Sequence, residues 1–224
     1  MVELDVRLTA DRVPVVLHDL DVSRTTGGSG LVHLMSLHEL KQLDATGGRG
    51  PREEIPTLRE VLEALSGRVA IDLEVKNLPS EPSFDSPREA IVGESLKVIE
   101  ETAFDGIVLV SSFKWLSIER AKQSSPDFPT GLITTADVDP WAALVYVGAK
   151  GHDLLLPQAA ALSTAGEAFV EAAHAKGIRV GTWTVDDPEA VDRMFAMGVD
   201  AIATNDPAMA VPIRDRFRRD ARTG

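Results

Sequence analysis

The side chains best suited to chemistry in this sequence are carboxylates that alternate with apolar residues in two short segments. Glu3 and Asp5 lie in segment 2–6, and Glu74 lies in segment 71–76. Side chains of a β-strand alternate between its two faces, so in each segment the charges share one face. If both strands belong to one sheet, the three carboxylates converge and repel one another. A divalent cation would offset this repulsion, and an all-oxygen ligand set favours Ca²⁺ or Mg²⁺ over Zn²⁺.

The same alternation has a simpler explanation. An antiparallel sheet with one face in water also alternates apolar and charged residues. Strands buried on both faces of a parallel sheet are instead almost continuously apolar. The alternation occurs twice here, in a chain otherwise rich in strand–helix units, and this favours a functional site inside a parallel sheet.

Three further residues are candidates for the site, and each also has a structural interpretation. His18 follows the apolar run 14–17, where it could donate or accept a proton, although a lone histidine is more often structural. Lys76 could bind a phosphoryl oxygen, or it could simply balance the neighbouring carboxylates. Trp183 could line a pocket, although packing is the usual role of an aromatic residue in a strand. The other histidines are predicted to be structural and distant from the carboxylates: His33, His38, His152 and His174.

Composition narrows the class of protein. The 224 residues include 44% hydrophobic and 26% charged residues, as in a globular protein. The net charge of −12 argues against a nucleic-acid partner or an anionic membrane surface. The absence of cysteine excludes disulfides, a thiol nucleophile and thiolate metal ligands. The oligomeric state is not predictable from these features.

The sequence also carries no sign of a membrane span or a leader. No apolar run approaches the ~18–20 residues that a transmembrane helix needs. Glu3 and Asp5 stand where a signal peptide would be basic and then apolar. A cytoplasmic location is therefore expected for the sequence as it begins at Met1, and a signal peptide upstream of a missing N-terminus would change that expectation.

Short apolar runs alternate with helical patterns along the chain. The predicted strands are 2–8, 14–17, 69–76, 106–111, 131–134, 153–156, 178–185 and 201–204. The predicted helices are 36–43, 58–66, 87–102, 114–124, 140–147, 164–176 and 188–197. Gly177 and Gly198 follow the last two helices, as left-handed helix ends prefer. Repeated strand–helix units predict a parallel sheet, and no glycine-rich dinucleotide loop follows any strand.

One predicted strand does not fit a parallel sheet. The turn at 9–13 is too short for a crossover helix, so strands 2–8 and 14–17 should form an antiparallel hairpin. We therefore predict an insertion at about 9–54 in a single domain spanning residues 1–224. Seven strands remain, one fewer than the eight of a TIM barrel.

Seven sequence blocks resemble the glycerophosphodiester phosphodiesterase family, and they occur in the family's order from end to end. They are Glu3–Thr9 (ELDVRLT), Val13–Asp19 (VPVVLHD), Asp21–Gly28 (DVSRTTGG), Ile55–Leu58 (IPTL), Leu73–Lys76 (LEVK), Trp183–Val185 (WTV) and Thr204–Pro207 (TNDP). The resemblance implies a TIM (β/α)₈ barrel and metal-dependent hydrolysis of glycerophosphodiesters to glycerol 3-phosphate and an alcohol.

The resemblance also implies a role for each candidate. The family's metal ligands correspond to Glu3, Asp5 and Glu74. One of its two catalytic histidines corresponds to His18. Its phosphate-binding lysine corresponds to Lys76, and the tryptophan of its substrate pocket corresponds to Trp183.

The family's first strand carries a His-Arg-Gly motif, and its first helix opens with Glu-Asn-Thr. Neither motif is present in this sequence. We therefore expect a TIM barrel without its first strand–helix unit, with the hairpin and loop insertion after the second barrel strand. Activity of the chain as given is expected to be impaired. The alternatives are a lysophospholipase D-like phosphodiesterase of the same superfamily and an inactive, truncated barrel.

Overall fold

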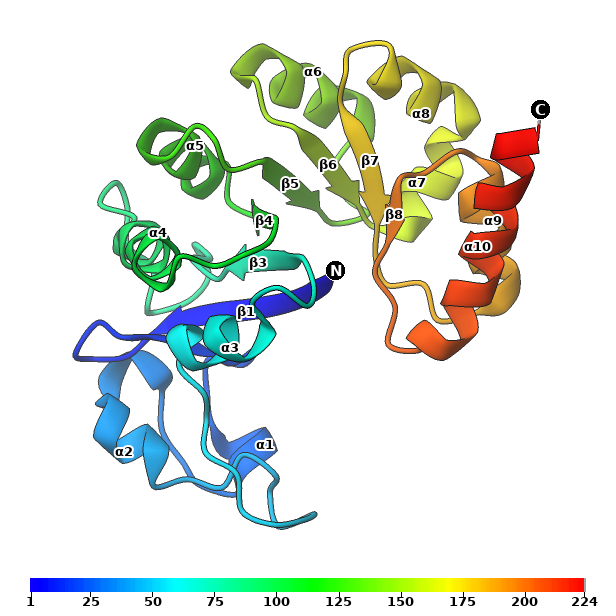
Figure 1. Cartoon of the computed structure of the whole chain (residues 1–224). Helices are drawn as coiled ribbons and strands as arrows, with labels where there is room; N and C mark the ends of the chain where they lie inside the picture. The colour runs from blue at the N-terminus through cyan, green and yellow to red at the C-terminus, as the bar shows by residue number, and fades with distance from the viewer. Residues whose placement is uncertain (224) are drawn as a thin grey trace. The chain divides into compact units, whose positions relative to one another are not determined.

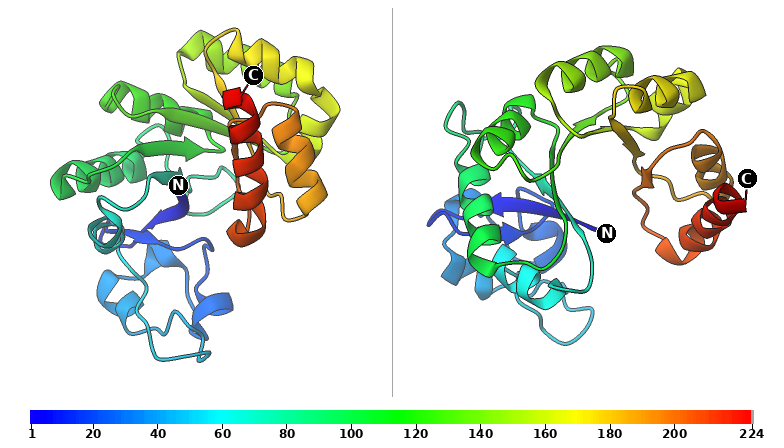
Figure 2. Two further views of the ribbon diagram at one scale, coloured as in Figure 1. Left: turned by 45° about the vertical axis from the view of Figure 1, so that its right-hand side comes forward. Right: turned by 45° about the horizontal axis from the view of Figure 1, so that its top comes forward.

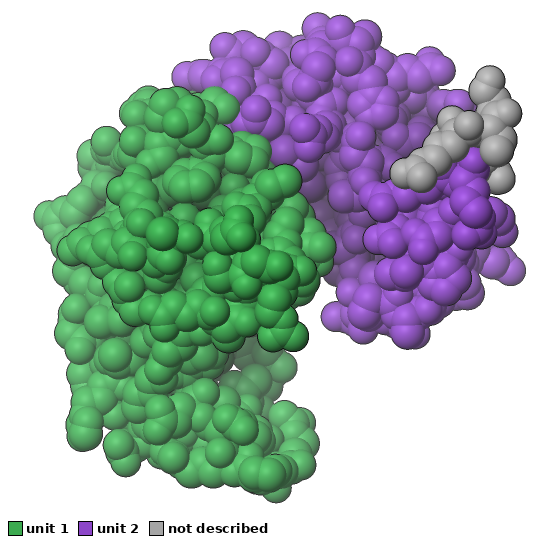
Figure 3. All heavy atoms as spheres, viewed as in Figure 1, with its two compact units in different colours: residues 1–129 green, residues 130–224 purple. Residues whose placement is uncertain are grey.

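The computed structural model describes residues 1–223, which form two compact units. Unit 1 spans residues 1–129 and unit 2 begins at residue 130 (Figure 3). All of the candidate residues except Trp183 lie in unit 1. The single domain expected from the sequence stays a prediction, and the two units are described separately below.

Unit 1 contains four strands in the order β2-β1-β3-β4 (Figure 1). They are β1 (Val2–Leu8), β2 (Pro14–Val16), β3 (Ile71–Val75) and β4 (Val108–Ser112). β1 pairs antiparallel with β2 and parallel with β3, and β3 pairs parallel with β4. The predicted hairpin is therefore confirmed, and the rest of the insertion follows β2.

The helical segments of unit 1 are α1 (Ser23–Thr26), η1 (Val32–Leu34), α2 (Leu37–Lys41), α3 (Leu58–Leu65), α4 (Ala90–Thr102) and α5 (Trp115–Ser124). α3 begins at a capping box, in which the Thr57 side chain accepts from the Glu60 amide and the Glu60 carboxylate accepts from the Thr57 amide. Ser36 and Glu39 form the same motif at the start of α2. The Thr57–Glu60 cap explains why the chain continues as a regular helix directly after the insertion.

The main core of unit 1 lies between the strands and helices α3 to α5 (Figure 2). Ile71, Leu73 and Val75 on β3 are at most 1% exposed and pack in one cluster with Leu62 of α3 and Val92 of α4. Burying this face against the helices places the alternate residues of β3 on the opposite face of the sheet. The insertion has a separate small core, formed by Val15, Val22, Val32, Leu40 and Ile55.

Unit 2 contains four parallel strands in the order β5-β6-β7-β8. They are β5 (Thr130–Thr134), β6 (Leu154–Pro157), β7 (Arg179–Thr182) and β8 (Ala201–Ile202). Its helices are α6 (Pro140–Lys150), α7 (Ala159–Ala165), α8 (Glu167–His174), α9 (Pro188–Ala196) and α10 (Pro207–Thr223). All seven predicted barrel strands are therefore present in the described residues, at slightly different bounds.

One predicted helix of unit 2 is wrong in its extent. The helix expected at 164–176 begins only at Glu167, because Gly166 has a φ of 76° and separates α7 from α8. Gly177 and Gly198 have φ of 74° and 86°, as their expected left-handed conformation requires. No helix in the described part of the chain is long and apolar enough to cross a membrane.

Candidate active site

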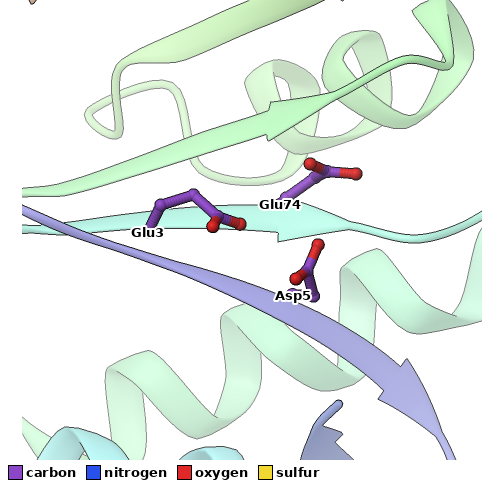
Figure 4. A group of neighbouring side chains, drawn as sticks. All are labelled: Glu3, Asp5 and Glu74. Carbon is purple, nitrogen blue, oxygen red and sulfur yellow. The ribbon is translucent and has the colours of Figure 1, made fainter. Parts of the chain in front are cut away.

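The three predicted carboxylates come together on one face of two neighbouring strands. The parallel register of β1 and β3 places Asp5 beside Glu74 and Glu3 beside Asp72. Glu3, Asp5 and Glu74 each offer one carboxylate oxygen, and these oxygens all lie within 4.8 Å of one another (Figure 4). The side chains point toward a common space on the face opposite the helices. We call these three residues the carboxylate cluster.

The clustering and burial shift the pKa values of Glu3 and Glu74. Desolvation and the negative charges of Asp5 and Glu74 raise the pKa of Glu3 to about 8. Burial also raises the pKa of Glu74, against the opposing charge of Lys76. Without a compensating cation, the cluster is therefore poorly suited to holding three ionised carboxylates near neutral pH.

Lys76 supplies part of the compensating charge. Its ammonium nitrogen lies 2.8 Å from Asp5 Oδ1 and also contacts Glu74. The side chain is 7% exposed. Burial alone would lower the pKa of Lys76, but the charges of Glu74 and Asp5 outweigh it and raise the pKa. The contacts fit the charge-balancing interpretation, and they also place an ammonium group beside the space that the carboxylates share.

A fourth carboxylate, that of Asp72 in the alternating segment 71–76, lies beside the cluster. Asp72 faces Glu3 across the strand pair, and its Oδ1 accepts a hydrogen bond of 2.6 Å from Ser111 Oγ on β4. Burial raises the pKa of Asp72 to about 6, although the Ser111 hydrogen bond opposes this shift. Asp72 thus adds negative charge on the same face of the sheet.

The carboxylate cluster fits a hard divalent cation. All of its donors are oxygens, and no histidine or cysteine belongs to it. Lys76, which contacts Asp5 and Glu74, supplies one positive charge for three carboxylates. Ca²⁺ and Mg²⁺ both prefer such donors. The role of Glu3, Asp5 and Glu74 as metal ligands stays a prediction that this geometry allows.

His18 follows β2, and the residue before it is hydrogen-bonded to β1. The Leu17 amide donates to the Asp5 carbonyl over 3.0 Å, so the chain passes directly beside the carboxylate cluster. The His18 side chain is 63% exposed, and its Nδ1 lies 2.7 Å from Asp19 Oδ1.

Arg7 holds the main chain of His18, a role that sequence reasoning missed. Its Nε donates to the His18 carbonyl over 2.8 Å, and its two terminal nitrogens donate to Glu81 over 2.7 and 2.9 Å. Arg7 is one pleat beyond Asp5 on the same face, and this spacing could have indicated it. Glu81 lies in the loop after β3, and nothing in the local sequence singles it out.

A small cavity adjoins this part of unit 1. It has a volume of about 170 Å³ and is lined by residues that include Arg7, Lys76, Asn77 and His33. His33, which the sequence predicts to be structural, lines this cavity together with Lys76. Of the other three histidines, His38 is exposed on α2, whereas His152 and His174 lie in unit 2. His174 contacts Asp200 over 2.8 Å.

Trp183 lies in unit 2, directly after β7. Its indole Nε1 donates a hydrogen bond of 2.9 Å to the Leu156 carbonyl of β6. The hydrogen bond fixes the ring near the ends of two adjacent strands of that unit. The role of Trp183 in a substrate pocket stays a prediction.

Known proteins resemble this chain along nearly its whole length. The glycerophosphodiester phosphodiesterase of Caldanaerobacter subterraneus subsp. tengcongensis is 33% identical, covering 92% of this chain and 82% of that protein. The glycerophosphodiester phosphodiesterase of Bacillus altitudinis is 32% identical, covering 97% of this chain and 87% of that protein. A phosphodiesterase from Oleispira antarctica, solved in complex with the product sn-glycerol-3-phosphate, is 28% identical with a TM-score of 0.83, covering 95% of this chain and 84% of that one.

The strand–helix units and this structural likeness define an α/β protein of the TIM-barrel type, as the sequence predicted. The model of the glycerophosphoryl diester phosphodiesterase family matches residues 1–209. The chain belongs to this family and is an enzyme of the phosphodiesterase class.

Proposed function

We propose that this chain hydrolyses glycerophosphodiesters to glycerol 3-phosphate and an alcohol, with the help of a divalent cation. The observation that carries the proposal is the convergence of Glu3, Asp5 and Glu74 beside Lys76. The substrate class comes from the relatives, which include glycerophosphodiester phosphodiesterases and a phosphodiesterase solved with sn-glycerol-3-phosphate.

Glu3, Asp5 and Glu74 would hold Ca²⁺ or Mg²⁺, with a small glycerophosphodiester as the substrate. A cation held there supplies Lewis acidity toward a phosphoryl oxygen and lowers the pKa of a hydroxyl group. The cytoplasmic location and the impaired activity expected from the sequence also stay predictions.

The protein's own residues would divide the remaining work. Lys76 would donate a charge-assisted hydrogen bond to a phosphoryl oxygen. His18 would exchange a proton with the attacking hydroxyl or with the oxygen of the leaving alcohol. The attacking hydroxyl could come from water or from the glycerol of the substrate. Trp183 would pack against the substrate.

The test is a product assay with glycerophosphocholine, run with Ca²⁺, with Mg²⁺ and with EDTA. Release of glycerol 3-phosphate is measured by coupling it to a glycerol-3-phosphate dehydrogenase. We expect cation-dependent release that falls by about 10²–10⁴-fold in His18→Ala. His38→Ala is the matched control, because that exposed histidine lies on α2 and should leave the rate unchanged.

Two results would contradict the proposal. Full activity in EDTA would exclude the cation, provided that the protein has first been dialysed against the chelator. Cleavage of lysophosphatidylcholine to lysophosphatidate, without cleavage of glycerophosphocholine, would assign the lysophospholipase D-like activity instead.

A further inference from the structure

Arg7 holds the main chain of His18 in place. Arg7 is 5% exposed and donates from Nε to the His18 carbonyl over 2.8 Å. The other edge of the Arg7 guanidinium is bound to both carboxylate oxygens of Glu81. A bidentate pair of this kind fixes direction as well as distance. The remaining freedom of His18 is therefore rotation of its side chain.

The ring of His18 is held by a chain of two further residues. Its Nδ1 lies 2.7 Å from Asp19 Oδ1, while the second oxygen of Asp19 contacts Arg24 Nε. Arg24 and then His18 lower the pKa of Asp19 to about 2, so the carboxylate is ionised at neutral pH. An ionised carboxylate can only accept hydrogen bonds. The Nδ1 atom must then carry the proton in this contact, which leaves Nε2 as the unprotonated nitrogen of the neutral ring.

We propose that Asp19 and Arg24 are positioning residues, which fix the His18 ring with its proton on Nδ1 so that Nε2 exchanges protons with the substrate. The inference rests on the proposed function of His18. Arg24 acts through Asp19, because it orients the carboxylate that holds the ring and keeps that carboxylate ionised. Neither residue needs to touch the substrate.

A purely stabilising role does not explain this arrangement. The side chains of His18 and Arg24 are 63% and 66% exposed, and exposed ion pairs contribute little to stability. Yet both oxygens of Asp19 are engaged, one toward the ring and one toward Arg24. An acceptor on Nδ1 is a recurrent means of setting which nitrogen of a catalytic histidine is protonated. The exposure also means that substitutions here should leave the fold intact.

The first measurement reads the ring itself. The ¹⁵N chemical shifts of His18 are recorded in the full chain at a pH where the ring is neutral, with His18→Gln used to assign the signals. We expect the Nδ1–H tautomer to predominate in the wild type and to lose its predominance in Asp19→Asn, whose amide can donate to Nδ1. Asp21→Asn is the matched control, because Asp21 lies in the same loop and accepts from the Ser23 amide.

The second measurement reads catalysis. We expect Asp19→Asn to lower kcat by about 10–10²-fold with KM and Tm little changed, since proton transfer by a positioned group contributes about 10²–10⁴-fold and only part of it should be lost. Arg24→Lys should keep more activity than Arg24→Met. Adding Asp19→Asn to His18→Ala should have no further effect on kcat.

The outcomes separate this inference from the proposed function. A wild-type ring with its proton on Nε2 would overturn the inference, as would an Asp19→Asn variant with unchanged tautomer and kcat. If the tautomer changes while kcat does not, the positioning role in catalysis is also overturned. Failure of the proposed function would appear instead as a wild-type protein that does not cleave glycerophosphocholine, whatever the tautomer.

Discussion

The ammonium nitrogen of Lys76 lies 2.8 Å from Asp5 Oδ1, which joins the residue after β3 to a carboxylate on the neighbouring strand β1. Lys76 also contacts Glu74, so one buried cation bridges two members of the carboxylate cluster. Lys76 therefore balances part of the negative charge of the cluster, and the proposed function also assigns it to the phosphoryl group. The two roles predict different results.

Replacing Lys76 with methionine separates these roles, because methionine keeps much of the apolar stem and removes the charge. If Lys76 binds the phosphoryl group, kcat/KM should fall by roughly 10–10²-fold, as loss of a charge-assisted hydrogen bond of ~1.5–3 kcal/mol implies. The affinity for Ca²⁺ should rise, because a competing cation has been removed. A variant with unchanged kcat/KM and a lower Tm would indicate that Lys76 only balances charge.

Substitution of the carboxylates tests the metal site directly. Asp5→Asn and Glu74→Gln keep the side-chain shapes but remove a negative ligand. Each should weaken Ca²⁺ or Mg²⁺ binding by at least about 10²-fold, since even indirect ligand partners contribute 10–100-fold. Isothermal titration calorimetry measures the affinity.

Asp72→Asn is the matched control for the carboxylate substitutions, because Asp72 lies on the same strand and face but its carboxylate is bound to Ser111. Its metal affinity should change by only a few fold. A loss of metal affinity as large as that caused by Asp5→Asn would show that Asp72 is also a metal ligand.

The raised pKa of Glu3 predicts a pH-dependent metal affinity. In the metal-free protein this carboxyl group, whose pKa is about 8, holds its proton below that pH. Cation binding must release the proton, so affinity should rise by up to about tenfold per pH unit between pH 6 and 8 and then level off. Calorimetry in buffers of different ionisation enthalpy should detect up to one proton released at pH 6.5. An affinity that is constant from pH 6 to 8 would show that Glu3 is already ionised.

The same shift predicts how pH affects the stability of the metal-free protein. The pKa of Glu3 is raised from 4.5 to about 8 on folding, so the folded state binds the proton more tightly. This contribution is complete below pH 4.5 and is lost as the pH rises to 8. Tm in EDTA should therefore be lower at pH 8 than at pH 6 in the wild type, and this difference should shrink in Glu3→Gln. Equal differences in both proteins would assign the loss to other groups.

Two substitutions of Trp183 distinguish substrate contact from packing. Trp183→Phe keeps an aromatic ring but loses the hydrogen bond to the Leu156 carbonyl, so it should lower Tm more than it affects KM. Trp183→Ala should raise KM for glycerophosphocholine by about 2–12-fold, which corresponds to the ~0.5–1.5 kcal/mol of an aromatic contact. If Trp183→Ala lowers Tm and leaves KM unchanged, the ring has only a packing role.

The sequence by itself determined the face on which Glu3, Asp5 and Glu74 lie. Alternation along a strand is a property of the local backbone, so an apolar face of Ile71, Leu73 and Val75 fixes the direction of the residues between them. The five-residue turn at 9–13 likewise excluded a crossover helix and so predicted the antiparallel pairing of β1 and β2. The order of the seven sequence blocks indicated the family, and the family resemblance in turn implied a role for each candidate residue.

Only the tertiary structure decided which side chains meet. The register that sets Asp5 beside Glu74 depends on how β1 and β3 align, and no residue in either strand specifies that alignment alone. Arg7 is paired with Glu81, which is 74 positions away in the sequence. Glu81 lies in a loop whose path cannot be predicted from the local sequence pattern. Gly166 divides α7 from α8 because its backbone takes a positive φ, which glycine permits but does not require. Local periodicity therefore gave the direction of the three strand carboxylates, whereas packing between distant segments selected their partners.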